Sequence, residues 1–425
     1  MTLASGLTTS GQVAGWVIGG AESQGRNRKA FHFDRINSVR VLSGDGASMT
    51  VITSPPADWT GANQPAGLAI HQGAMFGGGN GNAPHTLYAS LVADHEDFLG
   101  TPYSLLIGPE PGEEYIAALL SYKGGLLIWK YPKGVYFLDT SDPTRANWRA
   151  LKVGTAGAAG WGCVVAAEDD VPWVAPDGSW HLISATQVTG SVRAEDLTAR
   201  KLGGFFREQI ATIQLASAQM IYYSDKLEIM LACHALGGTA KSRRIHMVLN
   251  QKGEVGENWI YWDRDRNEAL FLRKRSQVYV PAMGDNAGQL WELDRPTRAA
   301  NGAAYTFEWW MADLDFSQVI PQWAGKWKNN RFIQVEYDPR GGAVTHAIEV
   351  YHDGALKQTI TFSLTAGQNT LPQTLPFTLG AQGLALTRPR SLKGRWRRIA
   401  LRGRTTVVNQ DVSIARVLIG AESGN

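Results

Sequence analysis

The sequence predicts an all-β protein, a β-propeller with a C-terminal β-sandwich-like domain. From about residue 31 onward, apolar runs of four to eight residues alternate with turn signals rich in Gly, Pro, Asn and Asp. Up to about residue 293 these runs fall into groups of three that recur along the chain, as strands do in the blades of a propeller. The 47 Gly and 15 Trp among 425 residues suit this class, because glycine permits tight corners and aromatic side chains fill sheet faces.

The groups are separated by short turns with clear turn chemistry. One group consists of residues 115–123, 125–131 and 134–139, joined by Lys-Gly-Gly and Pro-Lys-Gly turns. Similar groups follow at 163–184, 220–262 and 269–293. A sandwich also uses short strands with frequent turns, but the grouping in threes favours blades.

Two segments have less regular patterns. Residues 67–76 are predicted as one strand that pairs with 86–91 across the glycine-rich run 77–82. That run lacks the lysine of a phosphate-binding loop, so it is interpreted as a hairpin loop. Residues 193–209 are the best candidate for one or two short helices, interrupted by Gly203-Gly204.

The chain is expected to have three parts. Residues 1–30 are predicted as an N-terminal arm or closing strand, residues 31–300 as the propeller, and residues 301–425 as the sandwich-like domain. The boundary is placed where small residues dominate, near 299–304. The N-terminus shows no signal-peptide pattern, and no apolar run approaches the length of a membrane span.

The charge balance excludes a generally basic protein and leaves only local clusters to consider. The chain carries 41 Lys and Arg against 38 Asp and Glu, a formal net charge of +3, which is low for a nucleic-acid binder. Two clusters are candidates for a DNA channel or a subunit interface. The larger comprises Arg388, Arg390, Lys393, Arg395, Arg397, Arg398, Arg402 and Arg404, and the smaller comprises Arg264, Arg266, Arg273, Lys274 and Arg275. The residues alone leave open contact with DNA, with solvent or with an acidic neighbouring subunit.

The two cysteines, Cys163 and Cys233, lie in apolar surroundings. Two cysteines in so long a chain do not form a disulfide framework, so buried thiols and assembly in a reducing cytoplasm are expected, with a single disulfide as the alternative.

The sequence contains no pattern that recommends catalysis or metal binding. The nine histidines are scattered, and neither a His-Glu-x-x-His pattern nor a Gly-x-Ser-x-Gly elbow occurs. The densest polar set, Asp94-His95-Glu96-Asp97, is interpreted as a solvated loop, because an isolated acidic run seldom surrounds an ion. We therefore expect no enzyme activity, no catalytic or metal site and no cofactor.

Several short sequence segments, in their order along the chain, resemble segments of the β-propeller tail proteins of short-tailed bacteriophages. This family includes the tail nozzle (tail tubular protein B) and packaged-DNA stabilisation proteins. The segments resembling the central blades are YIAAL at 115–119, LLIW at 126–129, VYFLD at 135–139, SDP at 141–143, GCV at 162–164, WVAPDG at 173–178 and LIS at 182–184. The others are HTLYAS at 85–90, GQLWELD at 288–294, and, for the C-terminal sheet domain, residues 306–315, 393–395 and 399–401. The resemblance spans residues 35–420.

The resemblance implies a structural virion protein in the phage tail, assembled in the bacterial host cytoplasm. Such a protein forms a ring, commonly a homo-hexamer, below the portal and adaptor ring. It extends the DNA channel, helps to retain packaged DNA through non-specific contact, and anchors tail fibres or spikes. Aromatic side chains anchor such interfaces, and the candidates are Trp309, Trp310, Trp323 and Trp327. The alternatives are a receptor- or glycan-binding propeller at the tail tip and a hydrolytic propeller.

Overall fold

The computed structural model describes residues 15–19, 29–42, 48–100, 103–168, 170–185, 192–196, 210–238, 241–249, 255–263, 269–275, 278–284, 290–293, 305–317, 320–337, 344–364, 385–407 and 414–423. The chain divides into two compact units, Met1–Asp294 and Arg295–Asn425. The composition of the sequence predicts this boundary slightly later, after residue 300.

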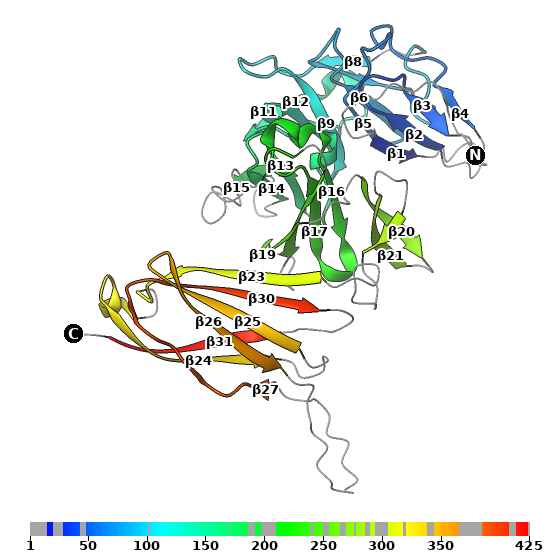
Figure 1. The fold of residues 1–425 in the computed structure, drawn as a ribbon. Coiled ribbons are helices and arrows are strands. Elements are labelled where there is room, and N and C mark those ends of the chain that lie inside the picture. Colours follow the sequence, from blue (N-terminus) through cyan, green and yellow to red (C-terminus); the bar gives the residue numbers. More distant parts are fainter. Residues whose placement is uncertain are drawn as a thin grey trace, which may run out of the picture. The chain divides into compact units, whose positions relative to one another are not determined.

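The first unit is a series of antiparallel sheets whose strands pair in chain order (Figure 1). The first three sheets have four strands each: β1 (Gly15–Gly19), β2 (Lys29–Phe33), β3 (Arg40–Leu42) and β4 (Met49–Val51); β5 (Gly67–His71), β6 (Ala74–Gly78), β7 (Thr86–Ala89) and β8 (Tyr103–Leu106); β9 (Tyr115–Tyr122), β10 (Gly125–Tyr131), β11 (Lys133–Asp139) and β12 (Arg149–Ala156). The next three are β13 (Asp170–Val174), β14 (Trp180–Ala185) and β15 (Val192–Asp196); β16 (Gln219–Tyr223), β17 (Glu228–Cys233), β18 (Arg243–Leu249) and β19 (Val255–Asp263); β20 (Ala269–Arg275), β21 (Val278–Gly284) and β22 (Leu290–Glu292).

The sheets of this unit meet through their first strands, as blades do around the axis of a propeller. Strand β5 contacts both β1 and β9, and β16 contacts β20. In the fourth sheet the short 3-10 helix η3 (Trp161–Cys163), just before β13, contacts β9 and β16. Glycine permits this close approach: a Cβ at Gly67 would lie 3.1 Å from the Ala118 backbone, and one at Gly162 would lie 2.3 Å from the Ala218 carbonyl oxygen. The all-β propeller predicted from the sequence is confirmed.

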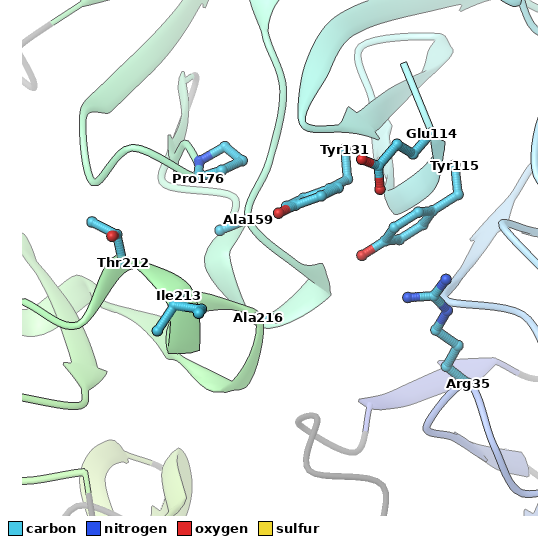
Figure 2. A pocket seen from close by; sticks show the side chains of 9 residues that line it. All are labelled: Arg35, Glu114, Tyr115, Tyr131, Ala159, Pro176, Thr212, Ile213 and Ala216. Carbon is cyan, nitrogen blue, oxygen red and sulfur yellow. The ribbon is translucent and has the colours of Figure 1, made fainter. Parts of the chain in front are cut away.

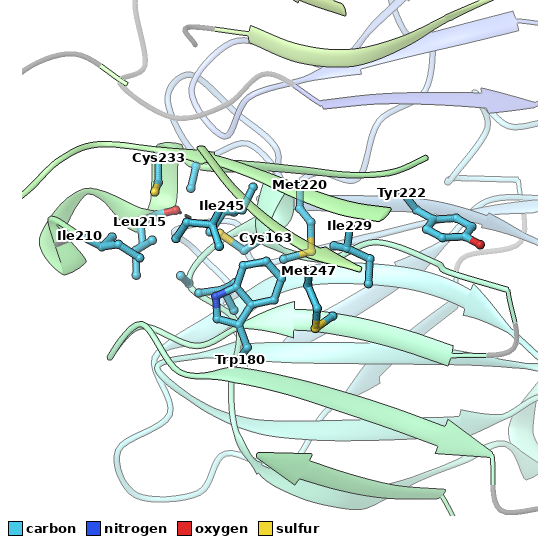
Figure 3. Packing of buried hydrophobic residues seen from close by; sticks show 14 of the residues in the cluster. Cys163, Trp180, Ile210, Leu215, Met220, Tyr222, Ile229, Cys233, Ile245 and Met247 are labelled. Atoms are coloured by element: carbon cyan, nitrogen blue, oxygen red, sulfur yellow. Dashed lines mark hydrogen bonds between the residues drawn. The ribbon is translucent and has the colours of Figure 1, made fainter. Parts of the chain in front are cut away.

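Apolar side chains fill the space between neighbouring sheets. In Figure 3, Trp180 of the fourth sheet packs among Met220, Ile229 and Met247 of the fifth. Cys163 lies in the same cluster and its thiol contacts the Leu215 carbonyl oxygen at 3.2 Å. Both cysteines are free and buried, and burial raises the pKa of each thiol to about 12.

The second unit is a sandwich of two sheets (Figure 1). One sheet has the order β23 (Tyr305–Leu314), β30 (Ile399–Val407), β25 (Val344–His352) and β26 (Ala355–Leu364). The other is built on β24 (Lys328–Tyr337), which pairs with β31 (Ile414–Ser423) on one side and with the short strands β27 (Ala385–Leu386), β28 (Arg390–Ser391) and β29 (Arg395–Trp396) on the other. Alternate residues of these strands, among them Ile333, Val335, Ile348 and Val350, are buried in a shared core.

Three sequence-based expectations need correction. Residues 67–76 form two strands, because Gln72 and Gly73 adopt positive φ angles of 46° and 75° and make a two-residue hairpin turn. Residues 192–196 form strand β15, antiparallel to β14, where a helix was expected, because pairing with a sheet outweighs local helix propensity. Residues 197–209 lie outside the described residues. The sequence does not predict the outer strands β8 and β12, because β8 has only four residues and the side chains of both strands are exposed or half-buried.

A fully buried ion pair lies inside the third sheet. Lys130 Nζ lies 2.6 Å from the Glu113 carboxylate, and both side chains are almost completely buried. The same ammonium donates to the Gly108 carbonyl at 2.7 Å, while the Tyr136 hydroxyl donates to Glu113 at 3.0 Å. Burial lowers the pKa of Lys130, and the adjacent Glu113 opposes that effect. The pair therefore holds the loop before β9 against the sheet at the cost of two desolvated charges.

The Glu113→Gln variant is expected to lower the free energy of unfolding by about 3–5 kcal/mol, since it leaves a buried ammonium without its carboxylate. Urea denaturation followed by tryptophan fluorescence measures this. The matched control is Glu110→Gln, which removes a half-exposed carboxylate that forms its ion pair with Lys152 and should cost at most about 1 kcal/mol. Equal losses in the two variants would contradict the argument.

His346 is buried in the core of the second unit as a neutral imidazole. Trp309 Nε1 donates to His346 Nε2 at 3.2 Å, and Thr405 Oγ1 hydrogen-bonds to Nδ1. Burial lowers the pKa of His346 from 6.5 to about 4.

Between these two pKa values the unfolded chain binds a proton that the folded chain does not, so stability falls as the pH is lowered from 6.5 towards 4. The decrease should reach about 3 kcal/mol by pH 4. Urea titrations of the wild type and of His346→Gln across this range provide the measurement. The variant lacks this titration, so an identical pH dependence in both proteins would rule out His346 as its source.

Candidate polyanion-binding surface

Six of the predicted basic residues line one edge of the second unit. This basic edge comprises Arg388, Arg390, Lys393, Arg395, Arg397 and Arg398, all exposed. The segment lies alongside β24 in space, because its two short strands, β28 and β29, each pair with a different part of β24. It therefore forms an interrupted edge strand. Among the described residues, no carboxylate forms an ion pair with the side chains of Arg388, Arg390, Lys393, Arg397 or Arg398.

The backbone of the basic edge is anchored while its side chains remain outside. Leu392 and Trp396 are buried in the sandwich core. Asn330 Nδ2 donates to the Lys393 carbonyl at 3.0 Å, and the buried Lys328 ammonium donates to the Arg397 carbonyl at 3.0 Å. These anchors fix the spacing of the cations along the edge.

An acidic side chain also holds this segment, without neutralising its guanidinium groups through an ion pair. The Asp353 carboxylate, in the turn between β25 and β26, accepts the backbone N–H of Arg397 at 3.2 Å and of Arg398 at 2.9 Å. The carboxylate therefore orients the chain, and the side chains of both arginines remain exposed.

An exposed aromatic ring lies within the basic edge. Trp327 is 40% exposed, with the Arg397 guanidinium 4.8 Å and the Arg395 guanidinium 6.0 Å from its ring centre. Cation–π contact at these distances holds two guanidinium groups over one ring. The ring therefore helps to fix the positions of two of the cations along the edge.

Arg402 and Arg404 belong to the same predicted cluster but lie in a different place. They project from β30 on the outer face of the other sheet, where Arg402 pairs with Glu308 at 2.7 Å and Glu349 at 3.3 Å, and Arg404 pairs with Glu308 at 3.4 Å. Burial acts to raise the pKa of Glu308, but the hydrogen bonds from Arg402 and Trp310 lower it overall. These two cations are therefore satisfied by cross-strand carboxylates.

The second predicted cluster is only partly described. Arg273 is exposed on β20. Lys274 and Arg275 belong to the same strand, and Arg264 and Arg266 lie outside the described residues.

The four predicted interface tryptophans have different environments. Trp309 packs against the sandwich core and stacks on His346 with ring centres 5.9 Å apart. Trp323 is half-buried. Trp310 is 58% exposed on the outer sheet face, with the Arg402 guanidinium 4.7 Å from its ring centre. Trp310 and Trp327 are thus the two of this set that present a large exposed surface.

The acidic set at residues 94–97 has its carboxylates engaged locally. Asp94 accepts the Glu96 N–H, Asp97 accepts the Leu99 and Gly100 N–H groups, and Glu96 pairs with Lys29. Within the described ranges, no group of three or more His, Cys, Asp and Glu side chains is placed to hold a metal ion. In that same part of the chain, no helix is both long enough and apolar enough to cross a membrane.

Comparisons with known proteins add no family assignment. No protein-family model matches the chain, and no curated protein sequence matches it. Among solved structures, the chain is similar to one in "Crystal Structure of Mitotic Checkpoint Complex", with a TM-score of 0.39 and 9% identity over 66% of this chain and 75% of that chain. At this level of similarity, the fold assignment rests on the strand order and the contacts described above.

Proposed function

We propose that the chain is a structural component of a bacteriophage tail, a ring-forming nozzle or head-to-tail connector that contacts packaged DNA. The observation that carries the proposal is the basic edge, whose cations are exposed and whose backbone is anchored. Phosphate contact needs positive charge at fixed spacing and no base-specific groups. The edge meets this need in a chain whose net charge is only +3.

The remaining parts of the proposal come from the sequence resemblance. A homo-hexameric ring would sit below the portal and adaptor ring, extend the DNA channel and anchor fibres or spikes, without catalysis. The exposed ring of Trp310, on the outer face of the other sheet, is a suitable anchor for contacts with neighbouring subunits, because large aromatic side chains contribute strongly to interfaces.

A competing explanation of the basic edge is protection against aggregation. Charged side chains and proline on an edge strand block pairing with another chain, and Pro389 lies within this segment. The two explanations differ in the sign of the charge they require. Edge protection is satisfied by either sign, whereas DNA contact requires positive charge.

Charge reversal separates the two explanations. The double variant Arg390→Glu/Arg397→Glu should stay soluble but bind duplex DNA more weakly, and the slope of log K against log salt should shrink by about 0.9 for each phosphate that the variant no longer neutralises. Fluorescence anisotropy of a labelled duplex over a salt series measures this. The control Lys133→Glu/Lys226→Glu makes the same charge change on exposed residues of the first unit. If both double variants bound DNA equally weakly, the loss of affinity would reflect the net charge of the chain and not the basic edge.

Native mass spectrometry tests the ring. The purified chain is measured alone and mixed with the portal and adaptor complex of its virion, and a closed oligomer, commonly of six subunits, is expected in at least one sample. Trp310→Ala should weaken assembly if this ring anchors the interface. A chain that stays monomeric in both samples would contradict the connector assignment.

A further inference from the structure

A pocket lies in the first unit where residues of four sheets converge. Its volume is about 270 Å³, and it is lined by residues at the ends of β9 and β10 and by residues of the loops and the 3-10 helix that flank the first, third, fourth and fifth sheets (Figure 2). The polar lining consists of Arg35, Glu114, Tyr115, Tyr131 and Thr212, and the apolar lining includes Pro176 and Ile213. Pockets for small molecules start at ~300 Å³, so this one suits a ligand of one or two rings.

A stack of three side chains forms one wall. The Arg35 guanidinium lies 3.8 Å from the Tyr115 ring centre, and Tyr115 stacks on Tyr131 with ring centres 5.3 Å apart. Tyr115 and Tyr131 are directly paired across β9 and β10, so their placement follows from the sheet register. Figure 2 shows the Tyr131 hydroxyl pointing away from the stack, towards Pro176 and Ala159.

The loop that carries Arg35 is held in an unusual conformation. Arg35 has a φ of 70°, which is uncommon for a residue with a side chain. The preceding Asp34 accepts the N–H groups of Ile36 at 3.2 Å and Asn37 at 2.7 Å, which fixes the turn. Strained residues that are held in this way are frequent at binding sites.

Three polar groups of the lining have no hydrogen-bond partner among the described residues: the Tyr131 hydroxyl, the Thr212 hydroxyl and the Glu114 carboxylate. Opposite them, Ile213 is 92% exposed. The pocket thus combines unused donors and acceptors with aromatic and aliphatic surface.

We infer that this pocket binds a neutral saccharide of one or two rings. Sugar rings present apolar C–H faces, which pack on aromatic rings, and hydroxyl groups, which pair with carboxylate, guanidinium and hydroxyl side chains. One positive and one negative side chain line the pocket, so their charges offset each other and favour an uncharged ligand over an anionic one. The inference is independent of the tail assignment, because it uses only residues of the first unit.

Saturation-transfer NMR on the full chain tests the inference with a panel of single sugars: glucose, galactose, mannose, rhamnose and N-acetylglucosamine, with glucuronic acid as the anionic member. At least one neutral sugar should bind, and glucuronic acid should bind more weakly than glucose. Dissociation constants for the best ligand are then compared among variants.

Two variants of Tyr131 distinguish the contribution of its ring to binding from that of its hydroxyl group. Tyr131→Ala should weaken binding about tenfold through the loss of stacking, and Tyr131→Phe should weaken it less. Glu114→Gln should also weaken binding, whereas Asp225→Asn, an equal charge change at an exposed residue outside the pocket, should not. Thermal unfolding confirms that each variant is folded.

The inference is overturned if no neutral sugar of the panel binds, if glucuronic acid binds best, or if folded Tyr131→Ala and Glu114→Gln variants bind as well as the wild type. None of these outcomes affects ring assembly or DNA binding, which are measured separately.

Discussion

The close approach of neighbouring sheets at their first strands is the constraint on which the first unit depends. Where β5 meets β9 and where η3 meets the segment before β16, backbone lies against backbone. A side chain at Gly67 or Gly162 would push these elements apart. Apolar side chains, among them the large ring of Trp180, fill the space between the fourth and fifth sheets. The same convergence brings loops of several sheets together around the pocket.

Buried polar groups provide a second level of organisation. Lys130 in the first unit and Lys328 in the second are both fully buried, and both ammonium groups donate to backbone carbonyls of loops. Lysine is seldom buried without a partner, and each of these holds an irregular segment to a strand. In the second unit the segment so held is the basic edge. A buried charge thus positions exposed charges of the same sign.

Much of the fold could be predicted from the sequence, because the inner strands of each sheet are continuous apolar runs. Residues 115–139 illustrate this: three expected strands match β9, β10 and β11 closely. The outermost strands could not be predicted in this way, since β12 consists of exposed and half-buried residues without regular alternation and is defined by pairing with β11. The two-residue turn at Gln72-Gly73 was missed because glutamine at a positive φ is a weak turn signal.

The candidate site was predicted in part. Sequence proximity grouped eight basic residues, and six of them share the basic edge. Arg402 and Arg404 differ because β30 continues into the other sheet, where Glu308 and Glu349 lie on adjacent strands. Those carboxylates are remote in sequence, so charge counting along the chain could not reveal them. The pocket could not be predicted, since its lining residues are spread from residue 35 to residue 216 and only the fold brings them together.

The two surfaces differ in the physical basis of recognition, and this difference bears on function. The basic edge offers several like charges along an extended segment, which favours a repeating polyanion over a compact ligand. The pocket offers offsetting charges, hydroxyl groups and aromatic rings in a small volume, which favours a compact uncharged ligand. A tail component that contacts DNA requires only the first property. A propeller that recognises a cell-surface glycan requires only the second, so the pocket is the feature that would extend the role of this chain from assembly to recognition.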